Sequence, residues 1–300
     1  MKLGPLQISA AIAISLITAS IGCRNAESDS SGSKQVANIV AFGDSITRGY
    51  GVPPGEGWVD LLCATMERGA SGDVVHIFNA GGNGNTSTEG LRRITSDVTL
   101  HLPGLVLVEF GGNDAVHDAR YVSVDEFEHN LLAIVREVRQ RGGSVALLTF
   151  PPVIDKWHVT HSDVFYSRRG GIDHYIETYR QRTRDVARRE GLALFDLDHF
   201  LRKLVEDHGP AAYIASDGVH LTPLANKLVA EAVFHFLTVS GYVHLSTNAM
   251  IEDPGKHVTT ATINSTGKSL FIAQHYEYNH FPACTELTDR RNKGARGCNV

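Results

Sequence analysis

The sequence predicts an α/β fold built on a doubly wound parallel sheet. Short runs rich in Val, Ile, Leu or Phe lack the polar alternation of a half-exposed strand, which is typical of strands covered by helices on both faces. Amphipathic helix patterns separate these runs, and strands that alternate with helices form a parallel sheet. The five expected strands are 38–42, 74–79, 105–110, 144–150 and 192–197.

Four segments carry an apolar stripe at helical spacing. The first begins at Trp58, and the second runs from Phe127 to Val138 after the acidic pair Asp125-Glu126, which suits a helix N-terminus. The third spans about 173–190. The fourth begins at Thr222-Pro223, a capping residue followed by proline at the first helical position.

Composition bounds the class of protein. With 300 residues, of which 42% are apolar and 20% charged, the chain can bury one sizeable core and a small appendage. The net charge of −5 argues against a nucleic-acid partner, because neutralising phosphates needs a clustered positive field. Two basic groups, Arg180, Arg184 and Arg188 at helical spacing and residues 290–293, are therefore expected to be solvated.

The N-terminus predicts export. A lysine and an apolar stretch over 8–21 precede Gly22-Cys23, which indicates a signal peptide over residues 1–22. Cys23 resembles the lipidated cysteine of a bacterial lipobox, although Ser20 stands where leucine is usual. We expect a lipoprotein held on a membrane through Cys23, periplasmic or at the cell surface. Cleavage without a lipid, giving a secreted protein, is the alternative. Residues 23–36 are expected to be a flexible tether.

The pattern changes after about residue 243. Runs at 258–263 and 269–272 flank a Ser-Thr-Gly-Lys turn and predict a hairpin in a small β appendage over 244–300, whose role the sequence does not indicate. Cys284 and Cys298 close a short loop there, and export would permit a disulfide between them.

Polar residues follow the first three expected strands, at the sheet edge where ligands bind in this architecture. The first strand leads into Gly43-Asp44-Ser45, the second into the glycine cluster of 79–86, and the third into Gly111-Gly112-Asn113-Asp114. The serine can be a nucleophile, and the glycines and asparagine can supply N–H groups to an oxyanion. Taken alone, each of these motifs can also be explained as an ordinary turn.

A fourth motif, Asp217-Gly218-Val219-His220, precedes the last helix. A carboxylate three residues before an imidazole can reach one ring nitrogen and leave the other free to take a proton from Ser45. Alternatively, Asp217 is a turn residue and His220 a structural partner.

Together the four motifs resemble those of the SGNH (GDSL-type) hydrolase superfamily, over about residues 38–238. The resemblance implies a flavodoxin-like, doubly wound, five-stranded parallel sheet in a domain over 37–243. It also implies a serine esterase that needs no cofactor and no metal. Two possible ligand groups, His158-x-x-His161 and Asp114 with His117 and Asp118, lack a recognisable metal spacing.

The resemblance assigns a role to each matching residue. It makes Ser45 the nucleophile and, through its backbone N–H, an oxyanion donor; Gly84 supplies a second N–H, with Gly82 as the alternative, and Asn113 a side-chain donor. His220 is then the general base and Asp217 orients it. The turn Asn83-Gly84-Asn85 departs from the usual Ser-Gly-Asp, which leaves its contacts open.

Three functions fit these residues. The first is a carboxylesterase that acts on short acyl esters or lysophospholipids, with the aromatic residues of the 151–172 loop lining an acyl pocket unless this is an ordinary surface loop. The second is a carbohydrate O-acetylesterase or O-acyltransferase, and the third a non-catalytic surface binding module. The partner is accordingly a small-molecule, lipid or glycan ester.

Overall fold

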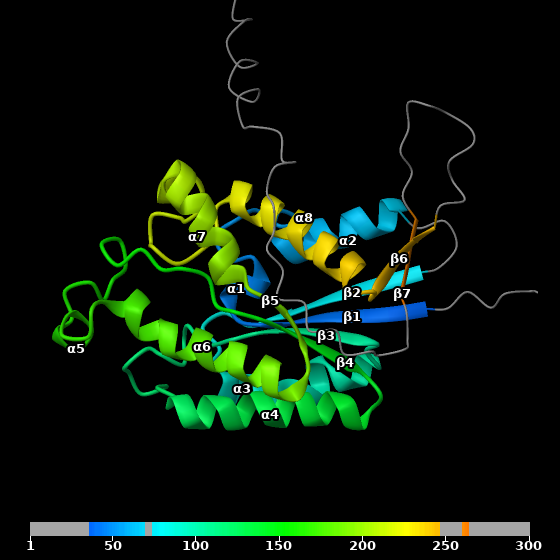
Figure 1. The fold of residues 1–300 in the computed structure, drawn as a ribbon, viewed down its shortest axis with the longest axis horizontal. Helices are drawn as coiled ribbons and strands as arrows, with labels where there is room; N and C mark the ends of the chain where they lie inside the picture. The colour runs from blue at the N-terminus through cyan, green and yellow to red at the C-terminus, as the bar shows by residue number, and fades with distance from the viewer. Residues whose placement is uncertain (1–35, 70–73, 247–259, 264–300) are drawn as a thin grey trace, which may run out of the picture. The chain divides into compact units, whose positions relative to one another are not determined.

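A five-stranded parallel sheet forms the centre of the molecule (Figure 1). The structure, a computed structural model, describes residues 36–69, 74–246 and 260–263. The strand order β2-β1-β3-β4-β5 confirms the expected doubly wound α/β sheet. The strands are β1 Val36–Gly43, β2 Val74–Gly81, β3 Leu105–Glu109, β4 Ser144–Leu148 and β5 Ala193–Phe195.

This strand order places the ligand crevice. The chain leaves β1 for β2 on one side and later returns to β3 on the other, so the order reverses between β1 and β3. Ligands bind at the carboxyl ends of the strands that flank such a switch point. Ser45 follows β1 and Asn113 follows β3, so the sheet brings both residues to the same edge.

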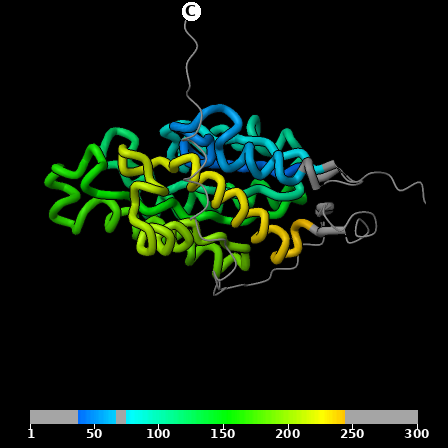
Figure 2. The backbone as a smooth tube through the Cα atoms, turned by 90° about the horizontal axis from the view of Figure 1, so that it is seen from above, coloured from blue at the N-terminus to red at the C-terminus, as the bar shows by residue number. Residues whose placement is uncertain are grey.

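Helices cover both faces of the sheet, as Figure 1 shows. Figure 2 looks down on one of the two helix layers, with α8 in yellow near the viewer. Because of this cover, all five residues of β3 are buried. On one face lie α2 (Trp58–Gly69), α7 (Leu197–His208) and α8 (Pro223–Val239); on the other lie α3 (Ser87–Asp97), α4 (Val124–Gln140) and α6 (Ile172–Glu190). The short elements are α1 (Ser45–Arg48), α5 (Val164–Ser167) and the 3₁₀ turns Thr99–His101 and Pro210–Ala212.

The four helices expected from the sequence are present, and α8 begins at Pro223 with the Thr222 hydroxyl accepting from the Ala225 N–H. Helices α3 and α7 were not expected. Few apolar residues are buried in α3, which is marked instead by a capping box between Thr86 and Glu89. The last strand is shorter than predicted, because α7 begins at Leu197, inside the segment that was expected to be extended.

A two-stranded antiparallel sheet follows α8. Its strands are β6 (Val243–Ser246) and β7 (Thr260–Ile263). The predicted strand at 258–263 overlaps β7, but its partner is β6, whereas the predicted partner at 269–272 lies outside the described residues. So do Cys284, Cys298, the predicted signal peptide, Cys23 and most of the tether. In the described part of the chain, no helix has the length and apolar character to cross a membrane.

The prediction that the arginines of α6 are all solvated is wrong for one of them. Arg180 is fully buried, whereas the side chain of Arg188 is 60% exposed. Arg184 lies between these extremes and forms an ion pair with Asp196. The side of α6 that carries Arg180 packs toward the end of β4, where carboxylates and backbone carbonyls surround the guanidinium.

Candidate active site

Ser45 stands at the first turn after β1. The Asp44 carboxylate caps α1 by accepting a hydrogen bond from the Ile46 N–H, at 2.8 Å. A side chain at position 43 would not fit, because its Cβ would lie 2.2 Å from the Thr47 hydroxyl oxygen. The tight turn therefore holds Ser45, which lines a cavity, at the carboxyl end of β1.

Ser45, His220 and Asp217 form a hydrogen-bonded chain. The Ser45 Oγ lies 2.9 Å from the His220 Nε2, and the His220 Nδ1 lies 2.6 Å from the Asp217 Oδ2. Burial acts to raise the pKa of Asp217, but hydrogen bonds from the His220 ring and two backbone N–H groups hold that pKa below its ordinary value. An ionised Asp217 favours the tautomer with a proton on Nδ1, which leaves Nε2 free to accept the Ser45 proton.

The loop that carries Asp217 and His220 is fixed by close backbone contacts. Gly218 has a positive φ of +79°, and its carbonyl accepts from the Ile154 N–H at 2.8 Å. A Cβ on Gly218 would lie 2.7 Å from the Ile154 carbonyl oxygen. Only glycine fits here, so the segment after β4 supports the loop of the histidine.

Ser45 and Gly84 each offer a backbone N–H at the cavity. Within the part of the chain that the structure describes, the N–H groups of Ser45 and Gly84 donate to no acceptor, and both residues line the cavity. Gly84 adopts the left-handed conformation, with φ +69°, and its carbonyl accepts from Arg120. Gly82, the alternative donor, uses its N–H in a bond to the Gly43 carbonyl at 3.0 Å. The geometry therefore favours Gly84.

The Asn113 side chain also reaches the cavity, but both its N–H groups are engaged. The Nδ2 donates to the Asp44 Oδ2 at 2.9 Å and to the Asn85 carbonyl at 3.1 Å. The first bond orients the amide. An oxyanion would have to replace the Asn85 carbonyl as acceptor of the second.

Buried acids lie directly beneath this site. Asp44 and Glu109 are at most 1% exposed, and Thr47 donates to Glu109 at 2.9 Å. Burial raises the pKa of Glu109 from 4.5 to about 7, and burial together with the charge of Glu109 raises the pKa of Asp44 well above its ordinary value. Near neutral pH the two carboxyls therefore retain a proton between them. Sequence reasoning missed Glu109, a single charged residue in an otherwise apolar strand.

The cavity has a volume of about 340 Å³, and both polar groups of the candidate site and apolar side chains line it. Of the aromatic loop expected to line it, His158 does so, but Phe165 instead stacks on His117 with a centroid distance of 4.0 Å. Sequence reasoning missed Tyr50, whose ring lies 4.6 Å from that of His220. The apolar lining consists of Val116, Phe150, Val153, Ile172, Ile176 and Val219.

Among the described residues, no group of three or more His, Cys, Asp or Glu side chains is arranged to hold a metal ion. The residues of the two possible ligand groups have other contacts. Asp114 accepts from the Ser87 hydroxyl, and the His158 Nδ1 lies 2.7 Å from the Thr160 hydroxyl.

Comparison with known proteins identifies the family. The model of the GDSL-like Lipase/Acylhydrolase family matches residues 41–228. The chain belongs to this family. It is therefore a carboxylic ester hydrolase, and the resemblance seen in the four motifs is confirmed.

Individual proteins and solved structures are also similar to this chain. The chain is 32% identical over 221 residues to the uncharacterised lipoprotein YqeF of Bacillus subtilis, covering 65% of this chain and 87% of that protein. It is 28% identical to an arylesterase of Vibrio mimicus, covering 68% and 90%. The crystal structure of a lipase/acylhydrolase from Enterococcus faecalis superposes with a TM-score of 0.55 and 26% identity, covering 67% and 95%.

Proposed function

We propose that this GDSL-like hydrolase cleaves carboxylic esters through an acyl-enzyme on Ser45, with His220 as general base and Asp217 orienting it. The observation that carries the proposal is the continuous Asp217–His220–Ser45 chain of hydrogen bonds, with distances of 2.6 and 2.9 Å, in the wall of a cavity. Proton transfer requires this reach between donor and acceptor.

The reaction has two steps, acylation of Ser45 and hydrolysis of the acyl-enzyme. The Ser45 Oγ attacks the ester carbonyl carbon while its proton passes to the His220 Nε2. The tetrahedral oxyanion collapses, the bond to the alcohol oxygen breaks, and His220 returns the proton to the departing alcohol. Water then attacks the acyl-serine by the same proton path and releases the acid.

Three donors can hold the oxyanion. These are the N–H groups of Ser45 and Gly84 and the Asn113 side chain, whose second N–H exchanges the Asn85 carbonyl for the oxyanion. Asp44 keeps the amide oriented through its own bond during this exchange. A preorganised donor contributes about 3 to 4 kcal/mol to stabilising the transition state, and the N–H groups of Ser45 and Gly84, which have no other acceptor in the described chain, meet this condition.

The leading substrates are short acyl esters or lysophospholipids. The apolar lining of the cavity suits a hydrocarbon chain, and its volume of about 340 Å³ lies at the lower end of the range for small-molecule sites. A relative in Vibrio mimicus is named an arylesterase, which supports a small-molecule ester as the substrate.

A carbohydrate ester is the second candidate, and a neighbouring groove favours it. This groove has a volume of about 710 Å³ and shares Tyr50 and Asn83 with the cavity. Arg48 and Asp60 also line it, and such side chains bind hydroxyl-rich alcohols. In that case a sugar would be the alcohol and a short acyl group would occupy the cavity.

We also propose that the catalytic domain, residues 37–243, is exported and held on a membrane through a lipidated Cys23. A 22-residue signal peptide would be removed, residues 23–36 would be a tether, and residues 244–300 would be a C-terminal β appendage. The support is the N-terminal pattern together with the 32% identical relative named a lipoprotein.

Hydrolysis of acetyl, octanoyl and palmitoyl nitrophenyl esters, compared with an acetylated polysaccharide, ranks the two substrate classes. Ser45→Ala is expected to abolish turnover with an unchanged melting temperature. Ser162→Ala, at an exposed serine, is the matched control and keeps full activity. Persistent turnover in Ser45→Ala would exclude the proposed mechanism.

A further inference from the structure

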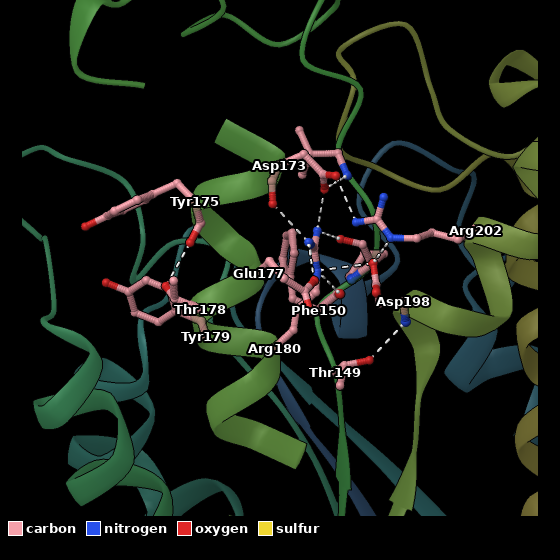
Figure 3. Close-up of polar contacts among 12 residues, drawn as sticks. Thr149, Phe150, Asp173, Tyr175, Glu177, Thr178, Tyr179, Arg180, Asp198 and Arg202 are labelled. Atoms are coloured by element: carbon pink, nitrogen blue, oxygen red, sulfur yellow. Dashed lines mark hydrogen bonds and ion pairs between the residues drawn. The ribbon is translucent and has the colours of Figure 1, made fainter. Parts of the chain in front are cut away.

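An arginine without solvent contact lies behind the cavity wall. Arg180 projects from α6 into a group of charged residues, which we call the Arg180 cluster: Arg180, Asp173, Glu177, Asp198 and Arg202 (Figure 3). The guanidinium carries five N–H groups, and the structure supplies five acceptors. So complete a set of partners is what makes burial of the charge tolerable.

Two of these acceptors are carbonyls of the segment that follows β4. The Arg180 Nε donates to the Phe150 carbonyl at 3.0 Å, and the Nη2 donates to the Pro151 carbonyl at 2.7 Å. The prolines at 151 and 152 have no N–H, so this segment cannot continue a strand ladder. The guanidinium therefore satisfies carbonyls that the sheet leaves without a partner.

Asp173 also binds the segment that follows β4. Its Oδ1 accepts from the Val153 N–H at 2.8 Å and from the Arg180 Nη2 at 2.6 Å. Burial acts to raise the pKa of Asp173, but the charge of Arg180 and the other donors hold that pKa below its ordinary value, so the pair is ionised. Residues 150–153 are thus fixed at three backbone atoms by one ion pair.

The segment held in this way is a wall of the cavity. Phe150 and Val153 both line it. The Phe150 ring packs against the backbone before Asn113, since a Cβ on Gly112 would lie 2.2 Å from that ring. The next residue, Ile154, donates to Gly218 in the loop of His220.

We propose that Arg180 is a positioning residue that sets acyl-chain selectivity by fixing the Phe150–Val153 wall of the cavity. This inference rests on the proposed function, since it assumes that the acyl group of the ester occupies the cavity. Arg180 touches neither substrate nor the reacting atoms and acts only through the segment that it holds. An acetyl group needs only Ser45 and the oxyanion donors, whereas a longer chain needs the wall.

Arg180→Lys tests this, because lysine keeps the charge but has three donors instead of a planar fork of five. We expect kcat/KM for an octanoyl ester to fall about tenfold more than for an acetyl ester, mainly through KM, since poor fit around a few methylenes costs that much. Arg202→Lys is the matched control. Arg202 pairs with the same Asp173 and Asp198 but has no hydrogen bond to residues 150–153 in the described chain, so the ratio stays at the wild-type value.

Asp173→Asn is the second variant, for use if Arg180→Lys does not fold. It keeps an acceptor for the Val153 N–H but removes the charge that faces Arg180, and it should shift the octanoyl-to-acetyl ratio in the same direction. An unchanged ratio in folded variants overturns the inference, and so does an equal loss for both esters, which would indicate a purely structural arginine. The proposed function fails by a different result, turnover that survives Ser45→Ala.

Discussion

Replacing Glu109 by Gln should remove a pH-dependent loss of stability. Glu109 is buried beside Asp44, and its pKa rises from 4.5 to about 7 on folding. The folded state therefore binds more protons than the unfolded state between these values. The contribution of Glu109 to stability therefore falls as pH rises through this window and levels off above it. A glutamine keeps the size of the side chain and an acceptor for Thr47, but it carries no titratable proton.

The size of the effect follows from the two pKa values. A tenfold change in proton affinity corresponds to about 1.4 kcal/mol, so the Glu109 carboxyl lowers the free energy of unfolding by roughly 2 to 3 kcal/mol between about pH 5 and about pH 8. The side chain is 1% exposed, so solvent screening does not diminish this. Asp114, whose pKa burial raises to about 6, contributes with the same sign in both proteins. Asp44 adds to the difference in the same direction, because losing the charge of Glu109 lowers the pKa of Asp44.

Urea unfolding followed by tryptophan fluorescence at the two pH values measures the difference. We expect the stability of Glu109→Gln to fall less between them than that of the wild type, by roughly 2 to 3 kcal/mol. Glu126→Gln, at an exposed position in the first turn of α4, controls for the substitution itself. If Glu109→Gln and the wild type lose the same stability, Glu109 does not hold a proton in the folded state.

Three further predictions concern other parts of the molecule. Asn113→Ala should lower kcat about 10² to 10³-fold with little change in KM, because its N–H stabilises the transition state rather than the bound ester; a loss confined to KM would contradict this. Gly218→Ala should lower the free energy of unfolding, measured in urea titrations, by about 1 to 3 kcal/mol. The reason is that alanine is strained at φ +79° and its Cβ would clash with the Ile154 carbonyl oxygen. Wild-type stability in this variant would show that the loop relaxes freely. Cys23→Ser should abolish the incorporation of labelled palmitate in bacterial cells and release activity from the membrane fraction, whereas unchanged labelling would place the lipid elsewhere.

The sheet and most of its helices were predictable, because continuous apolar runs mark strands that are buried on both faces. Helix α3 was not predicted, because it buries only Ser87, Gly90 and Ile94, which are too few apolar residues to form an apolar stripe at helical spacing. Helix α7 was not predicted for another reason. Its first residue, Leu197, continues an apolar run, and the run alone does not show where the strand ends.

The residues of the candidate site could be predicted to lie near one another, because each follows a strand or precedes the last helix. The structure places the Ser45 Oγ within hydrogen-bond distance of His220, and His220 within hydrogen-bond distance of Asp217. It also brings Gly84 and Asn113 to the same cavity. The choice between Gly84 and Gly82 needed coordinates. It depends on which N–H is already bonded, and a run of glycines does not reveal that.

The interior charges were not predictable from pattern alone. The spacing of Arg180 with its neighbours indicated a solvated face, because arginine is seldom buried. Arg180 is buried because of tertiary contacts that the sequence does not show. The carbonyls of Phe150 and Pro151 and the Asp173 carboxylate all accept hydrogen bonds from its guanidinium. Glu109 is similar, since only the fold reveals the Asp44 carboxyl beside it.

Covalent labelling by a fluorophosphonate probe, followed by peptide mass spectrometry, tests most directly whether Ser45 is the activated nucleophile. We predict one adduct, on the peptide that contains Ser45, with simultaneous loss of esterase activity and a much slower reaction in His220→Ala. A folded, active protein whose activity is lost through an adduct on another residue, or whose Ser45 stays unmodified while turnover continues, would contradict the assignment.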